Sequence, residues 1–384
     1  MLATEKKSYK GYKTALLLTG GGATAAYQVG VLKAIARFLP RNHGIPFPII
    51  CGTSAGAINA TTIACYASCY HLGVRKLEYV YNNLHTSKIY HSDAWLVFSH
   101  IARGILDGMR AGYASKRPVS LLNNEPLRQL LNQVVDFRRI DANISKDYLS
   151  SIAVTCSSYS SGDSISFYQA DKSIKPWARA KRRGVQTTLN ATHLLASSAI
   201  PLIFPSVKIK HEHFGDGSVS QLSPLSAPIH LGARRIFIIG VEQPRQHIHQ
   251  AVAFHQPPSG AEITGHLMDT VFSEALNGDL ERLQRINQTL SLIDDEAKQQ
   301  SPLKHIDSLL INPSKNFHVL ANEHYDELQW ALRAILRLMG SGRGSDSTLM
   351  SYILFQQNYC KRLIQIGFED GMERQQEIID FLDL

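Results

Sequence analysis

Short apolar runs alternate with longer amphipathic stretches along most of this chain. Apolar runs bounded by turn residues predict buried strands, whereas apolar residues three or four positions apart predict helices. The expected strands lie at 14–19, 47–51, 150–157, 164–169, 206–210, 235–241 and 305–311. The expected helices lie at 26–39, 55–70, 73–84, 125–134, 136–146 and 189–198. This alternation predicts an α/β fold with a mainly parallel sheet covered on both faces.

The pattern changes in the last third of the chain. A polar stretch containing prolines follows residue 242, and long helices are expected at 262–297, 321–340, 349–367 and 370–382. We therefore expect a core over 13–242 with a helical insertion at about 73–146. A mostly helical part over 243–384 is expected to pack on that core or complete it. Within the insertion, the apolar segment 95–106 is either an ordinary packed helix or a lid.

Ser54 stands at the point where an expected strand meets an expected helix. It is the serine of G-T-S-A-G at 52–56, which has the form G-x-S-x-G. A strand–turn–helix context is that of a nucleophile elbow, whose crowded turn needs small residues such as Gly52 and Gly56. The helix N-terminus next to the serine favours negative charge developing at a reacting carbonyl. Ser54 is therefore the candidate nucleophile.

A glycine-rich loop joins the first expected strand to the first expected helix. It consists of Gly20, Gly21, Gly22 and Ala23, and such loops present backbone N–H groups to an anion. The loop is an oxyanion hole for Ser54, a nucleotide phosphate cradle or a plain tight turn. A nucleotide cradle needs an acidic residue about 20 positions further on. The chain has no Asp or Glu between Lys6 and Lys76, which favours the oxyanion hole.

A serine hydroxyl needs a base to become a good nucleophile. The best candidate is Asp216, which lies between two glycines in an expected open loop. A Gly-Asp-Gly sequence alone indicates only a turn. The preceding stretch, A-S-S-A-I-P-L-I-F-P at 196–205, strengthens the assignment because it belongs to a larger pattern.

Four blocks of sequence carry a family resemblance. They are G-G-G-A-x-x-A-Y-Q-V-G-V-L at 20–32, G-T-S-A-G-A-I-N-A at 52–60, A-S-S-A-I-P-x-x-F-P at 196–205 and Asp-Gly at 216–217. In this order they resemble the patatin-like phospholipases, over roughly 13–242. The resemblance implies a three-layer α/β/α sandwich and a Ser54–Asp216 dyad without a catalytic histidine. It also implies an oxyanion hole at residues 20–23, a phospholipid or other fatty-acyl ester as substrate, and no metal or organic cofactor.

The chain departs from the family pattern next to the glycine-rich loop. Thr24 and Ala25 stand where Arg-Gly is usual, and Ser218 stands where Gly or Ala is usual. A hydroxyl cannot make the bonds of a guanidinium, so we expect a looser oxyanion hole or a brace from another cation, with 172–183 as a source. An acyl transferase or thioesterase using the same dyad stays open as an alternative, as does a catalytically weak lipid-binding or regulatory protein.

The 16 histidines raise two further alternatives. His230, His247 and His249 follow Asp216, which satisfies the order Ser, acid, His of α/β-hydrolases, but no motif surrounds them. The pairs His211/His213 and His247/His249 have the alternate spacing with which a strand grips a metal. Such positions more often simply tolerate histidine, so we expect neither a triad nor a metal site.

Composition and charge indicate where the protein is located and which surfaces it contacts. Hydrophobic residues make up 44% of the 384, which suffices for a core, and the five scattered cysteines indicate reduced thiols and a cytoplasmic location. The chain shows neither a signal peptide nor an apolar run of about 18 residues. The net charge of +8, concentrated in the first 77 residues and in 172–183, predicts peripheral contact with anionic membranes. No motif indicates nucleic-acid binding, and protein partners cannot be inferred.

Overall fold

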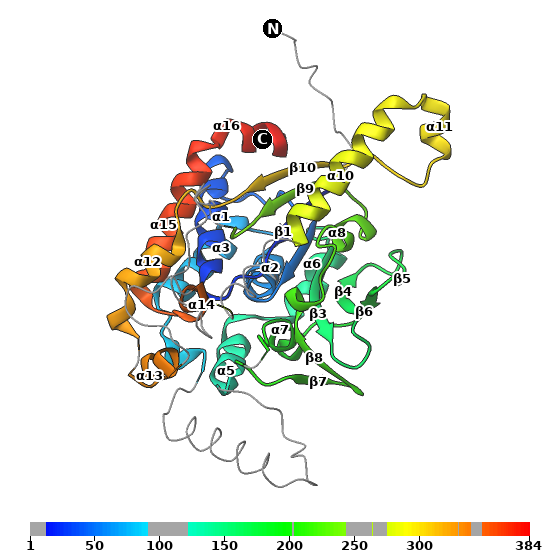
Figure 1. The fold of residues 1–384 in the computed structure, drawn as a ribbon. Coiled ribbons are helices and arrows are strands. Elements are labelled where there is room, and N and C mark those ends of the chain that lie inside the picture. The colour runs from blue at the N-terminus through cyan, green and yellow to red at the C-terminus, as the bar shows by residue number, and fades with distance from the viewer. Residues whose placement is uncertain are drawn as a thin grey trace, which may run out of the picture.

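A computed structural model describes residues 13–90, 122–201, 203–242, 263, 275–328, 330–338 and 348–384 (Figure 1). Three features of the sequence lie outside these ranges. They are the apolar segment 95–106, the pair His247 and His249, and the basic residues that precede Lys13. Most of the first part of the expected helix 262–297 lies outside them as well.

A mixed sheet with a parallel centre organises the described chain. The parallel strands are β1 (Lys13–Leu18), β2 (Ile49–Thr53), β3 (Ser151–Ser158), β9 (Ala233–Ile239) and β10 (Asp307–Ile311). On the other side of β3 follow β4 (Ser164–Ala170), β6 (Arg182–Gln186) and β5 (Trp177–Arg179). A hairpin of β7 (Val207–Ile209) and β8 (Glu212–Asp216) adds β8 antiparallel to β3. The mainly parallel sheet expected from the sequence is confirmed.

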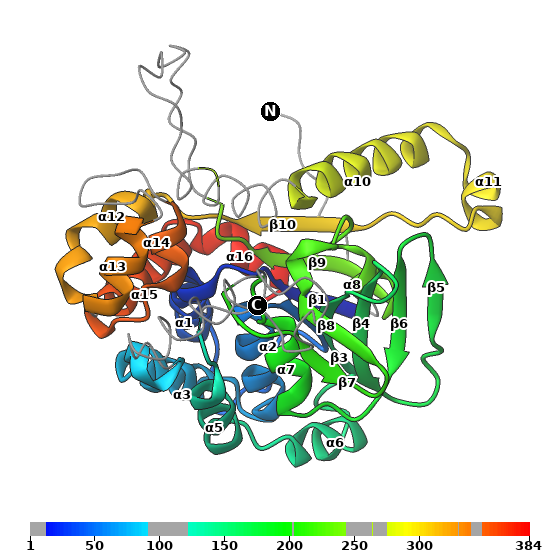
Figure 2. The ribbon, with the colours of Figure 1, turned by 60° about the horizontal axis from the view of Figure 1, so that its bottom comes forward.

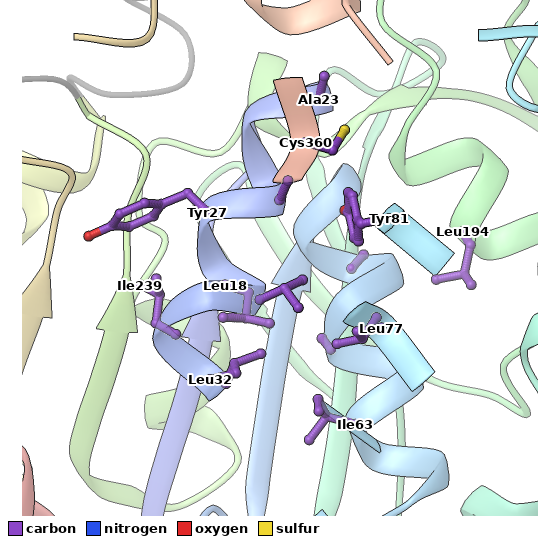
Figure 3. Close-up of a cluster of buried hydrophobic side chains, with 14 of the residues drawn as sticks. Leu18, Ala23, Tyr27, Leu32, Ile63, Leu77, Tyr81, Leu194, Ile239 and Cys360 are labelled. Carbon is purple, nitrogen blue, oxygen red and sulfur yellow. The ribbon is translucent and has the colours of Figure 1, made fainter. Parts of the chain in front are cut away.

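Helices cover both faces of this sheet and produce the three expected layers (Figures 1 and 2). One face carries α1 (Ala26–Phe38), α2 (Ala55–Cys65), α3 (Tyr70–Asn82), α5 (Glu125–Val134), α6 (Arg138–Ser145) and α7 (Ala191–Ser197). The other face carries α8 (Ser226–His230) and α10 (Ala275–Leu292), which is followed by α11 (Asp295–Gln300). The larger apolar core lies on the first face, where Leu18, Ile63 and Leu77 come together with Cys360 (Figure 3).

The C-terminal helices share this core. They are α12 (Phe317–Glu323), α13 (Trp330–Leu338), α14 (Thr348–Ile353), α15 (Gln357–Glu373) and α16 (Gln375–Leu382). α15 lies against α1 at two facing glycines: a Cβ on Gly30 would lie 2.1 Å from the Ile364 carbonyl oxygen, and one on Gly367 would lie 2.1 Å from that of Tyr27. A side chain at either position would therefore push the two helices apart.

Two long helices expected from the sequence are interrupted, and each break has a tertiary cause. Over 55–70 the helix ends at Cys65, because the Ala67 carbonyl accepts the Ile45 N–H and the Tyr70 N–H reaches the His43 carbonyl. Over 349–367 the helix breaks between α14 and α15. There the carbonyls of Ile353 and Phe355 accept hydroxyl hydrogen bonds from residues of the expected insertion.

Strand register brings the predicted site residues to one edge of the sheet. Leu18 pairs with Gly52, so the glycine-rich loop and the G-x-S-x-G turn leave neighbouring strands at the same level. Asp216 pairs with Cys156 near the carboxyl end of β3. In an open α/β sheet, ligands bind outside the carboxyl ends of the strands.

Candidate active site

Ser54 occupies a sharp turn between β2 and α2. Its φ of 55° and ψ of −131° place a non-glycine residue in a sparsely populated backbone region, which indicates stored strain at a functional position. The turn is also crowded. A Cβ on Gly56 would lie 2.3 Å from the Thr19 carbonyl oxygen, and one on Gly52 would lie 2.5 Å from that of Gly56. Both glycines of the motif are thus required by close backbone packing.

The Ser54 hydroxyl donates a hydrogen bond of 2.5 Å to Oδ2 of Asp216. Asp216 ends β8, and its Oδ1 accepts the Ser218 N–H at 3.0 Å, which fixes the orientation of the carboxylate. Both side chains are 1% exposed. Burial raises the pKa of Asp216 to about 6, although its bonds to Ser54 and Ser218 act in the opposite direction. A carboxylate with a pKa near neutrality is matched to proton transfer from a hydroxyl.

The Ala-Ser-Ser-Ala stretch at 196–199 accepts hydrogen bonds from the backbone N–H groups of Ser54 and Asp216, a role that the sequence did not reveal. Ser197 Oγ accepts the Ser54 N–H at 2.9 Å and donates to the Thr155 carbonyl at 2.6 Å. The Ala199 carbonyl accepts the Asp216 N–H at 2.9 Å. The conjunction of this stretch with Gly-Asp-Gly was the only sequence signal for these contacts.

The glycine-rich loop approaches Ser54 through Gly22. Gly22 lines the same cavity as Ser54, whereas Gly20 lines a separate small recess and Ala23 is buried in the core. The φ of Gly22 is +55°, and a Cβ there would lie 2.2 Å from the Tyr352 carbonyl oxygen of α14. Gly21 precedes it, and its carbonyl accepts the Thr24 hydroxyl at 2.8 Å. The C-terminal helices thus press directly on this loop.

A buried chain of neutral side chains ties the loop to the elbow helix. Gln28 of α1 donates to the Thr19 carbonyl at 2.8 Å, just before the loop. Asn59 of α2 donates to the Gln28 side-chain oxygen at 2.9 Å and to the Ala25 carbonyl at 3.1 Å. The Tyr81 hydroxyl completes the chain by donating to Asn59 at 3.1 Å. Neither Gln28 nor Asn59 has any exposed surface, so these bonds are shielded from water.

The expectation of a cation from 172–183 beside the loop finds no support in the described contacts. Arg182 donates to Ser223, and Arg183 pairs with Asp163 and Glu212. Asp163 precedes β4, Glu212 begins β8 and Ser223 follows Asp216, and no described bond joins either arginine to residues 20–25. In the described residues, the side chains that hold the glycine-rich loop are uncharged ones.

Ser54 lines an apolar cavity whose empty space, counted together with the open solvent at its mouth, is about 700 Å³. Aliphatic and aromatic side chains from α2, α3, α5, the segment after α7 and the turn after α14 make its wall: Ile58, Leu77, Val80, Leu127, Leu131, Val134, Ile200, Phe204 and Phe355. Such a pocket, with few polar groups at one end, is suited to a hydrocarbon chain whose reactive end meets Ser54.

The histidine alternatives receive no geometric support within the described ranges. The ring of His230 bonds to Ser226 and stacks on Trp177, and no described histidine bonds to Ser54 or Asp216. His213 contacts Ser206. No group of three potential metal ligands occurs in the part of the chain that the structure describes. Likewise, none of the described helices has both the length and the apolar character of a membrane span.

Comparison with known proteins agrees with the sequence motifs. No curated protein matches the chain significantly. Among solved structures, VipD from Legionella pneumophila matches with a TM-score of 0.34 and 11% identity, over 98% of this chain and 69% of VipD. The type III effector ExoU matches with a TM-score of 0.36 and 13% identity, over 95% of this chain and 53% of ExoU. The model of the patatin-like phospholipases matches residues 16–229, which is more than half of the chain. The chain therefore belongs to the patatin-like phospholipase family, a family of lipid hydrolases.

Proposed function

We propose that this protein is a serine acyl hydrolase that cleaves fatty-acyl esters of lipids through a Ser54–Asp216 dyad. The observation that carries the proposal is the 2.5 Å hydrogen bond from the Ser54 hydroxyl to the Asp216 carboxylate. Ser54 also lines an apolar cavity. The family membership supports the lipid substrate class, and the apolar lining of the cavity supports a fatty-acyl chain over a small polar ester.

The proposed reaction has two stages. Asp216 accepts the hydroxyl proton as Ser54 Oγ attacks the ester carbonyl, and the resulting oxyanion is bound by backbone N–H groups of Gly21 and Gly22, with Gly20 and Ala23 nearby. Collapse of this intermediate breaks the bond to the alcohol, which takes the proton from Asp216 and leaves. An acyl-Ser54 remains. Water then attacks the acyl-enzyme, Asp216 again accepts a proton, and the fatty acid leaves as the Ser54 hydroxyl is restored.

We also propose that residues 243–384 form one catalytic unit with the core. Phe355 contributes to the wall of the cavity, and the Tyr352 carbonyl lies against Gly22. The hydroxyls of Thr86 and Tyr90 bond the turn after α14 to the core at 3.2 and 3.0 Å. A chain shortened before α14 would therefore lose one side of the acyl site.

Lipid substrates place the enzyme at a membrane surface, and we propose that the net charge of +8 assists this contact. Binding to anionic vesicles should exceed binding to neutral ones and weaken as salt is raised. Co-sedimentation at low and high salt measures both effects. Equal binding to the two vesicle types would contradict the electrostatic contribution.

Hydrolysis of a long-chain phospholipid by the purified protein and its Ser54→Ala variant tests the proposal. Loss of the nucleophile should lower the rate by a factor of about 10³ or more while the fold persists. Asp216→Asn should cost a comparable factor, because the carboxylate touches the serine directly. Undiminished activity in either variant would refute the assignment of that residue.

A further inference from the structure

A second pocket lies at the same edge of the sheet as Ser54 but on the opposite face. Ile165 and Phe167 of β4 point into the core shared with α2 and α7, so Ser164 and Ser166 point to the other side. Hydroxyl and amide side chains gather around the pocket there: Ser164, Ser166, Ser220, Gln221, Ser223 and Ser226. The empty space of the pocket, counted together with the open solvent at its mouth, is about 420 Å³. The proposed hydrolysis gives this pocket no role.

Arg182 supplies the pocket with a positive charge that is only partly hydrogen-bonded. Its Nη1 donates to Ser223 Oγ at 2.8 Å, which fixes the guanidinium. Its buried Nε has no hydrogen-bond partner among the described residues. Because this Nε atom has less than 1 Å² of exposed surface, a ligand in the pocket would contact other atoms of the Arg182 side chain. Lys181, which is exposed, adds a second cation to the lining.

No salt bridge between described residues involves Arg182. Asp163 and Glu212 pair with Arg183 rather than with Arg182. Burial raises the pKa of Asp279, and the charges of Arg282 and Arg182 act in the opposite direction. The Asp279 carboxylate accepts the Leu225 N–H at 2.9 Å and contacts Arg282 at 3.3 Å. Burial lowers the pKa of His230, and the charges of Arg179 and Arg182 lower it as well, against its bond to the Ser226 backbone. A neutral His230 therefore does not add to the charge.

A rigid wall shapes the pocket. Trp177 stacks between Tyr168 and His230, with ring centroids 5.0 Å from each. Gly184 makes room for the indole, since a Cβ there would lie 2.3 Å from its ring atoms. The opposite side is the loop that follows Asp216, where Gln221 accepts the Thr53 hydroxyl at 2.8 Å. Thr53 directly precedes Ser54, so the pocket and the proposed dyad share supporting residues.

We propose that this pocket binds a phosphate group, held by the Arg182 guanidinium and the surrounding hydroxyls. A guanidinium beside several hydroxyls matches the geometry and charge of phosphate oxygens. The phosphate belongs either to a lipid headgroup or to a small free phosphate compound. The pocket does not depend on Ser54 chemistry, so Ser54→Ala protein should bind phosphate as the parent does.

Titration of the full chain with inorganic phosphate at constant ionic strength, followed by calorimetry, tests this proposal. We expect saturable binding that weakens at least tenfold in Arg182→Gln. Arg179→Gln is the matched control, because it removes the same charge from an exposed side chain of β5 that does not line the pocket. Ser223→Ala removes no charge and should weaken binding several-fold, which keeps the test decisive if Arg182→Gln fails to fold.

Vesicles distinguish the two sources of phosphate. If the ligand is a lipid headgroup, phosphatidylcholine vesicles containing phosphatidic acid should bind the parent more tightly than Arg182→Gln, and inorganic phosphate should compete. If the ligand is a free phosphate compound, Arg182→Gln should lose binding of inorganic phosphate and should bind the phosphatidic acid vesicles as tightly as the parent does. Absence of saturable phosphate binding, unchanged affinity in Arg182→Gln, or an equal loss in Arg179→Gln would overturn the proposal.

Discussion

Asn59 of the elbow helix donates a hydrogen bond of 2.9 Å to the side-chain oxygen of Gln28, which lies on the helix after the glycine-rich loop. Together with the bond from Asn59 to the Ala25 carbonyl, this contact connects the two segments that must act together on a carbonyl. Both residues are fully buried, so the bond is not exchanged with water. It joins the serine and the proposed oxyanion donors into one rigid unit without a cation.

Breaking this bond should impair catalysis more than substrate binding. Asn59→Leu leaves Gln28 and the Tyr81 hydroxyl without their partner, which should misalign the loop and lower kcat about 10- to 100-fold with little change in KM. Steady-state kinetics on a p-nitrophenyl acyl ester measures the split between the two constants.

Asn143→Leu is a matched control for that experiment. Asn143 is also buried and also supports α2, but it donates to the Ala64 and Cys65 carbonyls at the end far from Ser54. It should cost stability and leave kcat nearly unchanged. An equal fall of kcat in both variants, or in neither, would contradict a positioning role for Asn59.

The raised pKa of Asp216 predicts opposite effects of pH on activity and stability. The base must be ionised, so kcat/KM should fall as pH drops through about 6. In the unfolded chain the carboxyl titrates near its ordinary pKa of about 3.9, so the native state binds the extra proton between these values. Stability from this group is therefore present at low pH and lost as pH rises through about 6, at a cost on the order of 2–3 kcal/mol.

Asp216→Asn isolates the pH-dependent contribution of Asp216 to stability, because it removes the charge and keeps the shape of the side chain. Thermal melts of both proteins from pH 4 to pH 8 should show the variant gaining stability relative to the parent as pH rises, while it stays inactive. A constant difference across this range would mean that Asp216 titrates at its ordinary value in the folded protein.

The backbone conformation of Ser54 predicts a second case in which a functional residue lowers stability. Its positive φ favours glycine, so Ser54→Gly should be more stable than Ser54→Ala by about 1 kcal/mol, although both lack the nucleophile. Urea unfolding of the two variants measures the difference. If Ser54→Ala proved the more stable of the two, the turn would not be strained.

The apolar cavity predicts a dependence of rate on chain length. Ile58 lines the cavity and is only partly buried, so Ile58→Phe should narrow the space for an acyl chain. Hydrolysis of long-chain p-nitrophenyl esters should fall several-fold relative to the acetate ester, which serves as the internal control for an intact dyad. A uniform change for all chain lengths would indicate that the acyl chain lies elsewhere.

Local patterns in the sequence predicted the parallel centre of the sheet and the strand–turn–helix context of Ser54. The β5–β6 hairpin was not predicted, because 172–183 is rich in charge and its strands are short and lie at the sheet edge. The C-terminal helix broke at the turn containing Phe355, because contacts with Thr86 and Tyr90 outweigh local helical preference.

The candidate site was predictable only where residue type and spacing carried the signal. Ser54 and Asp216 stood out in the sequence, and the structure brings them together. The uncharged brace through Gln28 and Asn59 was not foreseen, because it joins residues 31 positions apart through contacts that only the packed helices create. The expected substitute for the missing arginine was a second cation, and the described contacts around the loop are those of amides and hydroxyls instead.

Labelling with a fluorophosphonate probe, followed by peptide mass spectrometry, tests the central claim most directly. A fluorophosphonate reacts with a serine only when a base and an oxyanion site activate it. The account predicts stoichiometric labelling of the peptide that contains Ser54, with loss of esterase activity in step, and labelling at least 100-fold slower in Asp216→Asn. Labelling of a different serine, or labelling of Ser54 that proceeds equally fast in Asp216→Asn, would contradict the proposed dyad.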